Sequence, residues 1–283
     1  MATIHVDLLG TETRYYETVR FRTRCIESGA GDPLLLLHGG GGHAETYSRN
    51  MRRLGERHRA MAIDFIWHGL SSKPAFKTGN WLKDLTQQVL ELMDFLSIDR
   101  ASVEGESLGA WVAMDLAINH PDRMKKIILN TAWGMDVPGI SEADFQSLRV
   151  ASINALRNPT VDLIRKRMEW LMPLGGTTDE IVDVRLALWS RADTRDALIA
   201  YYDRLFSPEC AQYMFGLNEL AQIELPTLLM WTEKNPYAGP SVARAMADVI
   251  RGSQLHIMSG AAHWPQWEKP EEHDRVVLAF LDK

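Results

Sequence analysis

The stretch VEGESLGAW, residues 103–111, places one serine between two glycines, Gly105 and Gly109. The residues before the serine indicate a short strand, and LGAWVAMDLAINH (108–120) indicates a helix. A turn that leads from a strand directly into a helix gives its central residue an unusual backbone conformation and crowds the residues two before and two after. Glycine at those two places relieves the crowding. The pattern therefore predicts that Ser107 presents its hydroxyl at the start of a helix.

A serine in this position has the setting of a nucleophile. The free N–H of Leu108 and the dipole of the following helix favour an oxyanion beside the Ser107 hydroxyl. A G-x-S-x-G motif also arises by chance, so a glycine-rich turn in a non-catalytic relative is the alternative. The strand–turn–helix context favours the nucleophile.

Buried strands alternate with helices along most of the chain. Strands are predicted at the apolar runs PLLLL (33–37), RAMAID (59–64), KKIILNTAW (125–133) and PTLLMW (226–231). This alternation predicts an α/β fold, with a mostly parallel sheet flanked by helices on both faces. From 134 to 219 the periodicity is helical. We expect an α/β core of residues 1–133 and 220–283, interrupted by a helical cap at 134–219.

The first part of the chain contains a further strand signal. Residues 19–25 alternate between arginines and other side chains, a period of two that predicts a strand. Arg20, Arg22 and Arg24 fall on the same side of that strand. We interpret their side as a solvated face.

Composition excludes several classes of function. The 283 residues carry a net charge of −6, which argues against a nucleic-acid surface. No apolar stretch approaches the ~20 residues of a membrane span, and the first residues lack the pattern of a signal peptide. Cys25 and Cys210 lack metal-ligand spacing and indicate free thiols. We expect a cytoplasmic protein that acts on a small molecule, without metal, membrane or nucleic acid. The sequence leaves a monomer and a homo-oligomer both open.

The partners of a nucleophilic serine are sought in loops that follow strands. His38 and the glycines at 39–42 follow an early buried strand, and an N–H near Gly40 can join that of Leu108 in an oxyanion hole. A phosphate-binding loop would need a lysine after the glycines, and none is present. His263 follows the last predicted strand, SQLHIM (253–258), where the order serine, acid, histidine places the base. His68 is interpreted as structural.

The chain resembles the α/β-hydrolase family over nearly its whole length. The segments HGGGG (38–42), GESLG (105–109) and HWPQWE (263–268) are similar to the meta-cleavage product hydrolases, which cut C–C bonds in ring-fission products of aromatic compounds. The resemblance implies a cofactor-independent serine hydrolase. It also implies that Arg185 in the cap binds a substrate carboxylate and that Trp264 lines the same pocket.

Further residues are candidates for contact with the substrate. A solvated helix charge is the alternative for Arg185. Gly41 and His43 are placed at the pocket mouth, with a surface position as the alternative for the histidine. Glu106 departs from the family, which usually has asparagine there. A carboxylate so near the nucleophile would repel an anionic substrate unless it is protonated or paired.

The acid of the triad is the other departure. The family has glycine, two residues and aspartate after the strand that matches PTLLMW, and here Thr232 and Asn235 take those two places. Asparagine can accept a hydrogen bond from the histidine but cannot stabilise imidazolium by charge. Glu233 is an alternative acid. An acid after the preceding strand would fall near Thr131, with Asp136 somewhat beyond.

These features predict hydrolysis of a C–C bond in a 2-hydroxy-6-oxo-dienoate, a carboxylate-bearing product of aromatic degradation. A carboxylesterase or lactonase would use the same groups. Oxygen or lyase chemistry without a cofactor is another reading of the scaffold. A ligand-binding relative with a weakened triad is a further alternative, and Asn235 is its main support.

Overall fold

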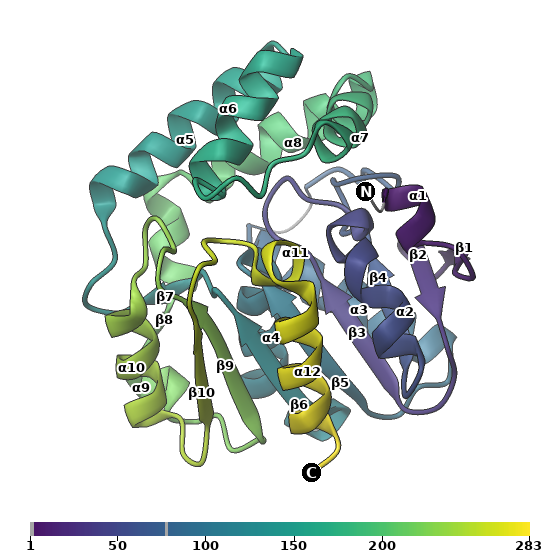
Figure 1. Cartoon of the computed structure of the whole chain (residues 1–283), viewed down its shortest axis with the longest axis vertical. Helices are drawn as coiled ribbons and strands as arrows, with labels where there is room; N and C mark the ends of the chain where they lie inside the picture. Colours follow the sequence, from purple (N-terminus) through teal and green to yellow (C-terminus); the bar gives the residue numbers. More distant parts are fainter. Residues whose placement is uncertain (1–2, 77–78) are drawn as a thin grey trace.

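A mostly parallel sheet runs through the middle of the molecule (Figure 1). The computed structural model describes residues 3–76 and 79–283, and in this part of the chain eight strands form one sheet in the order β1-β2-β4-β3-β5-β6-β9-β10. The strands are Glu12–Glu17 (β1), Arg22–Ser28 (β2), Pro33–Leu37 (β3), Arg59–Ile63 (β4), Ala101–Glu106 (β5), Met124–Asn130 (β6), Thr227–Thr232 (β9) and Gln254–Met258 (β10). β2 pairs antiparallel with β1 and β4, and the other pairs are parallel.

Helices cover both faces of this sheet, which confirms the predicted α/β fold. Side chains of β3 alternate between two cores: Leu35 and Leu37 pack on one face, Leu34 and Leu36 on the other. The first face is covered by α3 (Trp81–Phe95), α4 (Leu108–Asn119) and α10 (Pro240–Val249). The second is covered by α2 (Ser48–Gly55) and α12 (Pro270–Leu281). Because both faces are covered, β3 is apolar from Leu34 to Leu37, and even the polar residues of β5 are buried.

A helical segment is inserted between the neighbouring strands β6 and β9. It contains α5 (Glu142–Arg157), α6 (Val161–Leu171), α7 (Asp179–Trp189) and α8 (Ala192–Leu205). Figure 1 shows these four helices above the edge of the sheet where the parallel strands end. Two-residue strands on either side of them, β7 (Met135–Asp136) and β8 (Phe215–Gly216), pair with each other. The helical segment, residues 142–205, therefore faces the loops that follow β3, β5, β9 and β10.

Short helices complete the chain at its ends and near the sheet edge. They are α1 (Ile4–Asp7), α9 (Leu217–Leu220), α11 (Pro265–Glu268) and the 3₁₀ helices η1 (Ala44–Tyr47), η2 (Pro121–Arg123) and η3 (Pro208–Tyr213). Cys25 and Cys210 are buried free thiols, as predicted. In residues 3–76 and 79–283, no helix is both long and apolar enough to cross a membrane.

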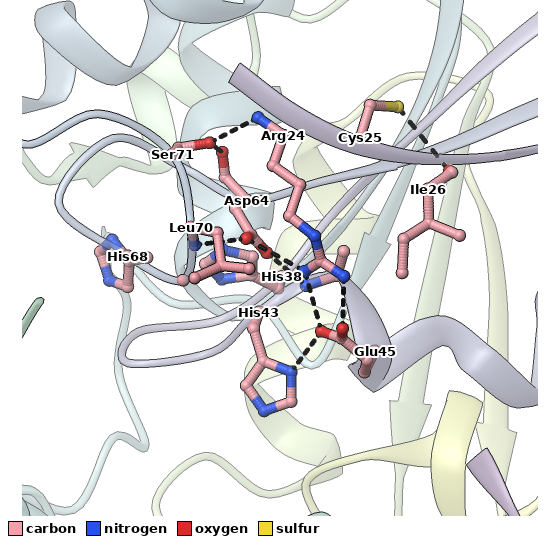
Figure 2. A network of polar contacts seen from close by, with 12 residues as sticks. Arg24, Cys25, Ile26, His38, His43, Glu45, Asp64, His68, Leu70 and Ser71 are labelled. Atoms are coloured by element: carbon pink, nitrogen blue, oxygen red, sulfur yellow. Dashed lines mark hydrogen bonds and ion pairs between the residues drawn. The ribbon is translucent and has the colours of Figure 1, made fainter. Parts of the chain in front are cut away.

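The first strands differ from the sequence prediction. β1 was not predicted, and β2 begins at Arg22 rather than at residue 19. The prediction of a solvated arginine row is wrong for Arg24, which is 6% exposed. Its guanidinium donates to Asp64 at 3.2 Å and to Glu45 at 2.5 Å (Figure 2). The loop after β4 folds back over β2, and its Ser71 hydroxyl accepts a hydrogen bond from the Arg24 N–H. This loop covers Arg24, although the alternating sequence of β2 is typical of a strand with a solvated face.

Candidate active site

Ser107 lies at the turn between β5 and α4. Its φ of 51° and ψ of −108° lie in a region that residues other than glycine rarely adopt. A Cβ atom on Gly105 would lie 2.1 Å from the backbone of Gly109, and one on Gly109 would lie 2.0 Å from the carbonyl oxygen of Leu37. The two glycines therefore let α4 begin directly against β5 and β3. This close packing holds Ser107 in its strained turn.

Two segments beside Ser107, the start of α4 and the loop after β3, offer backbone N–H groups to the cavity. Leu108 is the first residue of α4, so its N–H has no acceptor within the helix. Gly39 and Gly40 lie in the loop after β3 and line the same cavity as Ser107 and Leu108. These positions suit an oxyanion hole. Gly41 has a φ of 70°, and its carbonyl accepts a hydrogen bond from the Trp189 indole at 3.2 Å.

His263 lies in the loop between β10 and α11. Its main chain is fixed by two hydrogen bonds: the Thr131 hydroxyl donates to its carbonyl at 2.8 Å, and its N–H donates to the carbonyl of Leu171 at 3.1 Å. Nδ1 of the ring lies 2.9 Å from Oδ1 of Asn235. The Asn235 amide nitrogen donates to the carbonyl of Ala238 at 2.9 Å, which turns the amide oxygen toward the histidine. Nδ1 of His263 therefore carries the hydrogen and donates it to Asn235.

The other candidates for the acid lie elsewhere. Glu233 and Asp136 have exposed side chains. Thr131 is buried and serves the main chain of His263, as described above. Asn235, which is 6% exposed, is thus the side chain that faces Nδ1.

Tyr237 joins the serine and the histidine, and sequence reasoning did not find it. Its hydroxyl lies 3.3 Å from Oγ of Ser107 and 3.4 Å from Nε2 of His263. Burial raises the pKa of Tyr237, so the phenol is neutral at physiological pH. Its position two residues after Asn235, in the loop that follows β9, is the sequence feature that could have suggested it.

Glu106 also contacts Nε2 of His263. Its side chain is 1% exposed, and Oε1 is 3.1 Å from Nε2 of His263. The carboxylate also packs on the glycine loop, since a Cβ atom on Gly39 would lie 2.3 Å from Oε2. Neither carboxylate oxygen accepts an aligned hydrogen bond from the residues that the structure describes. The charge that the sequence placed near the nucleophile is therefore buried and paired with His263.

Arg185 on α7 is fully buried, so the alternative of a solvated helix charge is wrong. Within the described part of the chain, Nε, Nη1 and Nη2 all lack a hydrogen-bond acceptor. The guanidinium carbon lies 5.1 Å from the centre of the Trp264 ring and 5.5 Å from that of Trp189. Burial, and then the charge of Arg167, lower the pKa of Arg185. A buried guanidinium without an acceptor is costly, and a bound anion would offset that cost.

Arg167 on α6 is a second buried cation, and sequence reasoning missed it too. Its guanidinium donates to Ser152 at 2.9 Å, and to the Gly40 carbonyl and the Tyr202 hydroxyl at 3.1 Å each. Nη1 has no acceptor among residues 3–76 and 79–283. Because Arg167 lines the cavity, it can contact an anionic ligand there.

Ser107, His263, Tyr237, Glu106 and Arg167 line one cavity between the sheet edge and the helical segment. The sheet side contributes Ser107, Glu106, Tyr237 and His263, and Trp133 and Trp264 lie beside them. The helical segment contributes mainly apolar side chains, from Phe145, Leu148, Leu171, Leu205 and Phe206. The cavity thus offers an apolar volume with a few polar groups at one side, as is usual for a small-molecule site.

The early histidines support the glycine loop. His38 Nδ1 donates to the Gly39 carbonyl at 2.7 Å, while Nε2 accepts from the Phe65 N–H at 3.1 Å. Burial lowers the pKa of His38 to about 4, so the ring is neutral. His43 is buried rather than on the surface, and its Nδ1 lies 2.9 Å from Glu45 in the network of Figure 2. His68 is buried as well, with Nδ1 3.0 Å from the Ile66 carbonyl.

Comparison with known proteins agrees with this fold. The model of the alpha/beta hydrolase fold matches residues 32–270, so the chain belongs to the α/β-hydrolase fold family. The chain is 27% identical over 269 residues to the 2-hydroxy-6-oxononadienedioate/2-hydroxy-6-oxononatrienedioate hydrolase of Cupriavidus pinatubonensis, covering 92% of this chain and 91% of that one. It is also 27% identical to the 2-hydroxymuconate semialdehyde hydrolase of a Pseudomonas strain, covering 92% and 90%.

Solved structures show the same architecture. The meta-cleavage product hydrolase of Pseudomonas fluorescens superposes with a TM-score of 0.82 at 19% identity, over 95% of this chain and 97% of that one. This likeness extends across the sheet and the helical segment.

Proposed function

We propose that the chain is a cofactor-independent serine hydrolase that cuts a C–C bond in a 2-hydroxy-6-oxo-dienoate, a ring-fission product of aromatic catabolism, in the cytoplasm. The observation that carries the substrate class is Arg185, a buried guanidinium without an acceptor in the described chain, beside the Trp264 ring of the cavity. An anionic substrate would supply that acceptor. The curated relatives above act on substrates of this kind according to their names.

The proposed reaction has two stages. The dienol substrate first becomes its keto tautomer, losing a proton from the enol oxygen and gaining one at the carbon that will leave. Ser107, or a water molecule in its place, then attacks the ketone, and its proton passes toward His263. The resulting oxyanion is stabilised by N–H groups near Gly40 and Leu108. Collapse of this intermediate breaks the C–C bond, and the leaving carbon takes up a proton. Where Ser107 was the nucleophile, a water molecule then hydrolyses the acyl-enzyme, which releases the carboxylic acid and restores the serine.

The helical segment has a part in this proposal. We assign residues 134–219 to a cap and residues 1–133 and 220–283 to a hydrolase core. The cap supplies Arg185 and Arg167 and most of the apolar lining, while the core supplies the nucleophile and the base. Such a division excludes water from the reacting bond.

A panel assay tests the proposal. The protein is incubated with a coloured 2-hydroxy-6-oxo-dienoate and, separately, with neutral nitrophenyl esters, and kcat/KM is measured for each. We expect turnover of the dienoate with a higher kcat/KM than of any ester, and loss of both in Ser107→Ala. Turnover of esters without the dienoate would favour a carboxylesterase. Binding of the dienoate without turnover would favour a ligand-binding protein, for which Asn235 in place of an acid is the supporting observation.

A further inference from the structure

The two nitrogens of His263 face partners of different charge. On Nδ1 is the Asn235 amide, held in place by its own bond to Ala238. On Nε2 is the carboxylate of Glu106 at 3.1 Å. The neutral group thus occupies the place where a triad has its acid, and a buried carboxylate contacts the other ring nitrogen, without an aligned hydrogen bond between them.

The resting state of His263 and Glu106 follows from the number of protons that the two side chains hold together. Nδ1 carries a hydrogen, because it donates to the Asn235 oxygen. A neutral ring would then present a lone pair on Nε2, and an ionised Glu106 would present another on Oε1. Two buried electronegative atoms 3.1 Å apart with no hydrogen on either repel each other. One proton between them removes the repulsion, whether it belongs to the imidazolium or to the carboxylic acid.

From this geometry we propose that Glu106 is the acid–base partner of His263: it shares one proton with Nε2 and supplies the negative charge that Asn235 does not. Glu106 lines the cavity beside Ser107, so the shared proton lies next to the reacting atoms. Glu106 thus takes the part of the acid that is absent at Asn235. It lies beside the opposite nitrogen of the His263 ring, one residue before Ser107 in the sequence.

The pair can serve both stages of the proposed reaction, and this step rests on the proposed function. In the tautomerisation, the shared proton moves to the substrate carbon and the enol proton replaces it, so the pair ends as it began. In the cleavage, the pair takes up the proton of Ser107, giving imidazolium beside a neutral carboxylic acid. It then returns that proton to the leaving carbon. No oxidant or further reactant is needed.

Other titratable groups face this pair and affect its charge. Tyr47 on η1, Tyr237 and the cation Arg185 interact with Glu106. Burial raises the pKa of both tyrosines, so they are neutral at physiological pH. Glu268 on α11 lies near His263, and its carboxylate accepts the Ala262 and Trp264 N–H groups. These groups are unchanged in the variants below, so differences between variants report Glu106 itself.

Nuclear magnetic resonance of histidines labelled with ¹⁵N tests the proposal without a substrate. The chain has nine histidines, and His263→Gln identifies the signal of His263 by its loss. In the wild type we expect a protonated or hydrogen-bonded Nε2 at pH 7. Glutamine carries no charge and supplies no acid proton, so in Glu106→Gln the ¹⁵N signal of Nε2 at pH 7 should move toward that of a nitrogen without a hydrogen.

Two further variants separate charge from structure. Glu106→Asp keeps the charge on a shorter side chain, so the ¹⁵N signal of Nε2 at pH 7 should lie between those of the wild type and Glu106→Gln. In the double variant Glu106→Gln with Asn235→Asp, a carboxylate beside Nδ1 replaces the one beside Nε2, and the Nε2 signal should return toward its wild-type position. Circular dichroism checks the fold of each variant.

Specific results would overturn the proposal. One is an Nε2 signal of His263 that is the same at pH 7 in Glu106→Gln as in the wild type. If Glu106→Gln does not fold, the wild-type spectrum decides, since an Nε2 at pH 7 that bears no proton and shows no hydrogen-bonded shift contradicts the shared proton. These measurements need no turnover. They therefore remain decisive even if the panel assay shows that the dienoate is not the substrate.

Discussion

The hydroxyl of Tyr237 lies 3.3 Å from Oγ of Ser107, and it also lies 3.4 Å from the histidine nitrogen that would receive the serine proton. The phenol thus bridges Ser107 and His263, the proposed nucleophile and base. Tyr237→Phe removes this bridge while keeping the ring, which stacks edge-on against Trp133. Loss of a hydrogen bond of ordinary net strength changes a rate or equilibrium constant about tenfold. We expect kcat to fall about tenfold, with KM little changed, in steady-state assays on the best substrate of the panel.

A matched control is Tyr213→Phe, which removes a hydroxyl bonded to the Gly79 carbonyl in an exposed setting. That variant should keep the wild-type kcat. If Tyr237→Phe also keeps it, the tyrosine has no part in proton transfer and merely fills space.

Arg185 should affect binding and stability in opposite directions. In Arg185→Met, KM for an anionic dienoate should rise about 10- to 100-fold, because a charge-assisted hydrogen bond contributes about 1.5–3 kcal/mol, while KM for neutral esters stays the same. The unliganded variant should also unfold at a higher temperature, because a buried charge without an acceptor is removed. Calorimetry and steady-state kinetics measure the two effects.

The control for this prediction is Arg195→Met on α8, where the guanidinium is exposed and pairs with Asp196. Arg195→Met should change neither KM nor the unfolding temperature. Equal changes in KM for anionic and neutral substrates would make Arg185 a structural residue.

Gly109 should tolerate no side chain. In Gly109→Ala the new Cβ atom would lie 2.0 Å from the Leu37 carbonyl oxygen, so α4 would have to move away from β3. Overpacking of this kind costs typically about 1–3 kcal/mol in the free energy of unfolding. Urea unfolding should show that loss, and activity should fall further because Ser107 moves with the helix. Gly239→Ala, where nothing lies within 4 Å of the new atom, should be close to wild type.

His273 predicts a dependence of stability on pH. Its ring is fully buried, with Nε2 2.7 Å from Glu104 and Nδ1 2.9 Å from Asp274. Burial would lower its pKa, but these two carboxylates outweigh burial and raise it from 6.5 to about 10. A raised pKa means that the stabilisation is complete below pH 6.5 and is lost as the pH rises toward 10.

Urea unfolding at several pH values between 6.5 and 10 measures this effect. The free energy of unfolding should fall across the interval in the wild type and fall less steeply in His273→Gln. Equal slopes in the two proteins would show that His273 does not carry the proton.

The sequence predicted the fold and the nucleophile turn because both depend on local patterns. Apolar runs of strand length between helical repeats specify a parallel sheet, and Gly105 and Gly109 specify a close crossing. The geometry of His263 and Asn235 followed from their places in loops after strands, since the fold determines where such loops meet.

Other parts depend on contacts between distant segments, which local patterns do not encode. Tyr237 contributes through a hydroxyl whose direction depends on the loop after β9. Arg167 and Arg24 have the spacing of solvated charges, yet the packing of α6 on the glycine loop and of the loop after β4 on β2 buries both. Glu106 was visible in the sequence as a departure, but its pairing with His263 required the structure.

The glycine loop is attached to the helices above it as well as to the sheet below. The carbonyl of Gly40 accepts a hydrogen bond from Arg167, and that of Gly41 accepts one from Trp189. Any motion that lifts α6 and α7 to admit a ligand must break both bonds and release the peptide units on the C-terminal side of Gly40 and Gly41, which adjoin the Gly40 N–H proposed for the oxyanion hole. Entry of the ligand and assembly of the catalytic backbone are then a single event, and an open molecule would be both accessible and inactive.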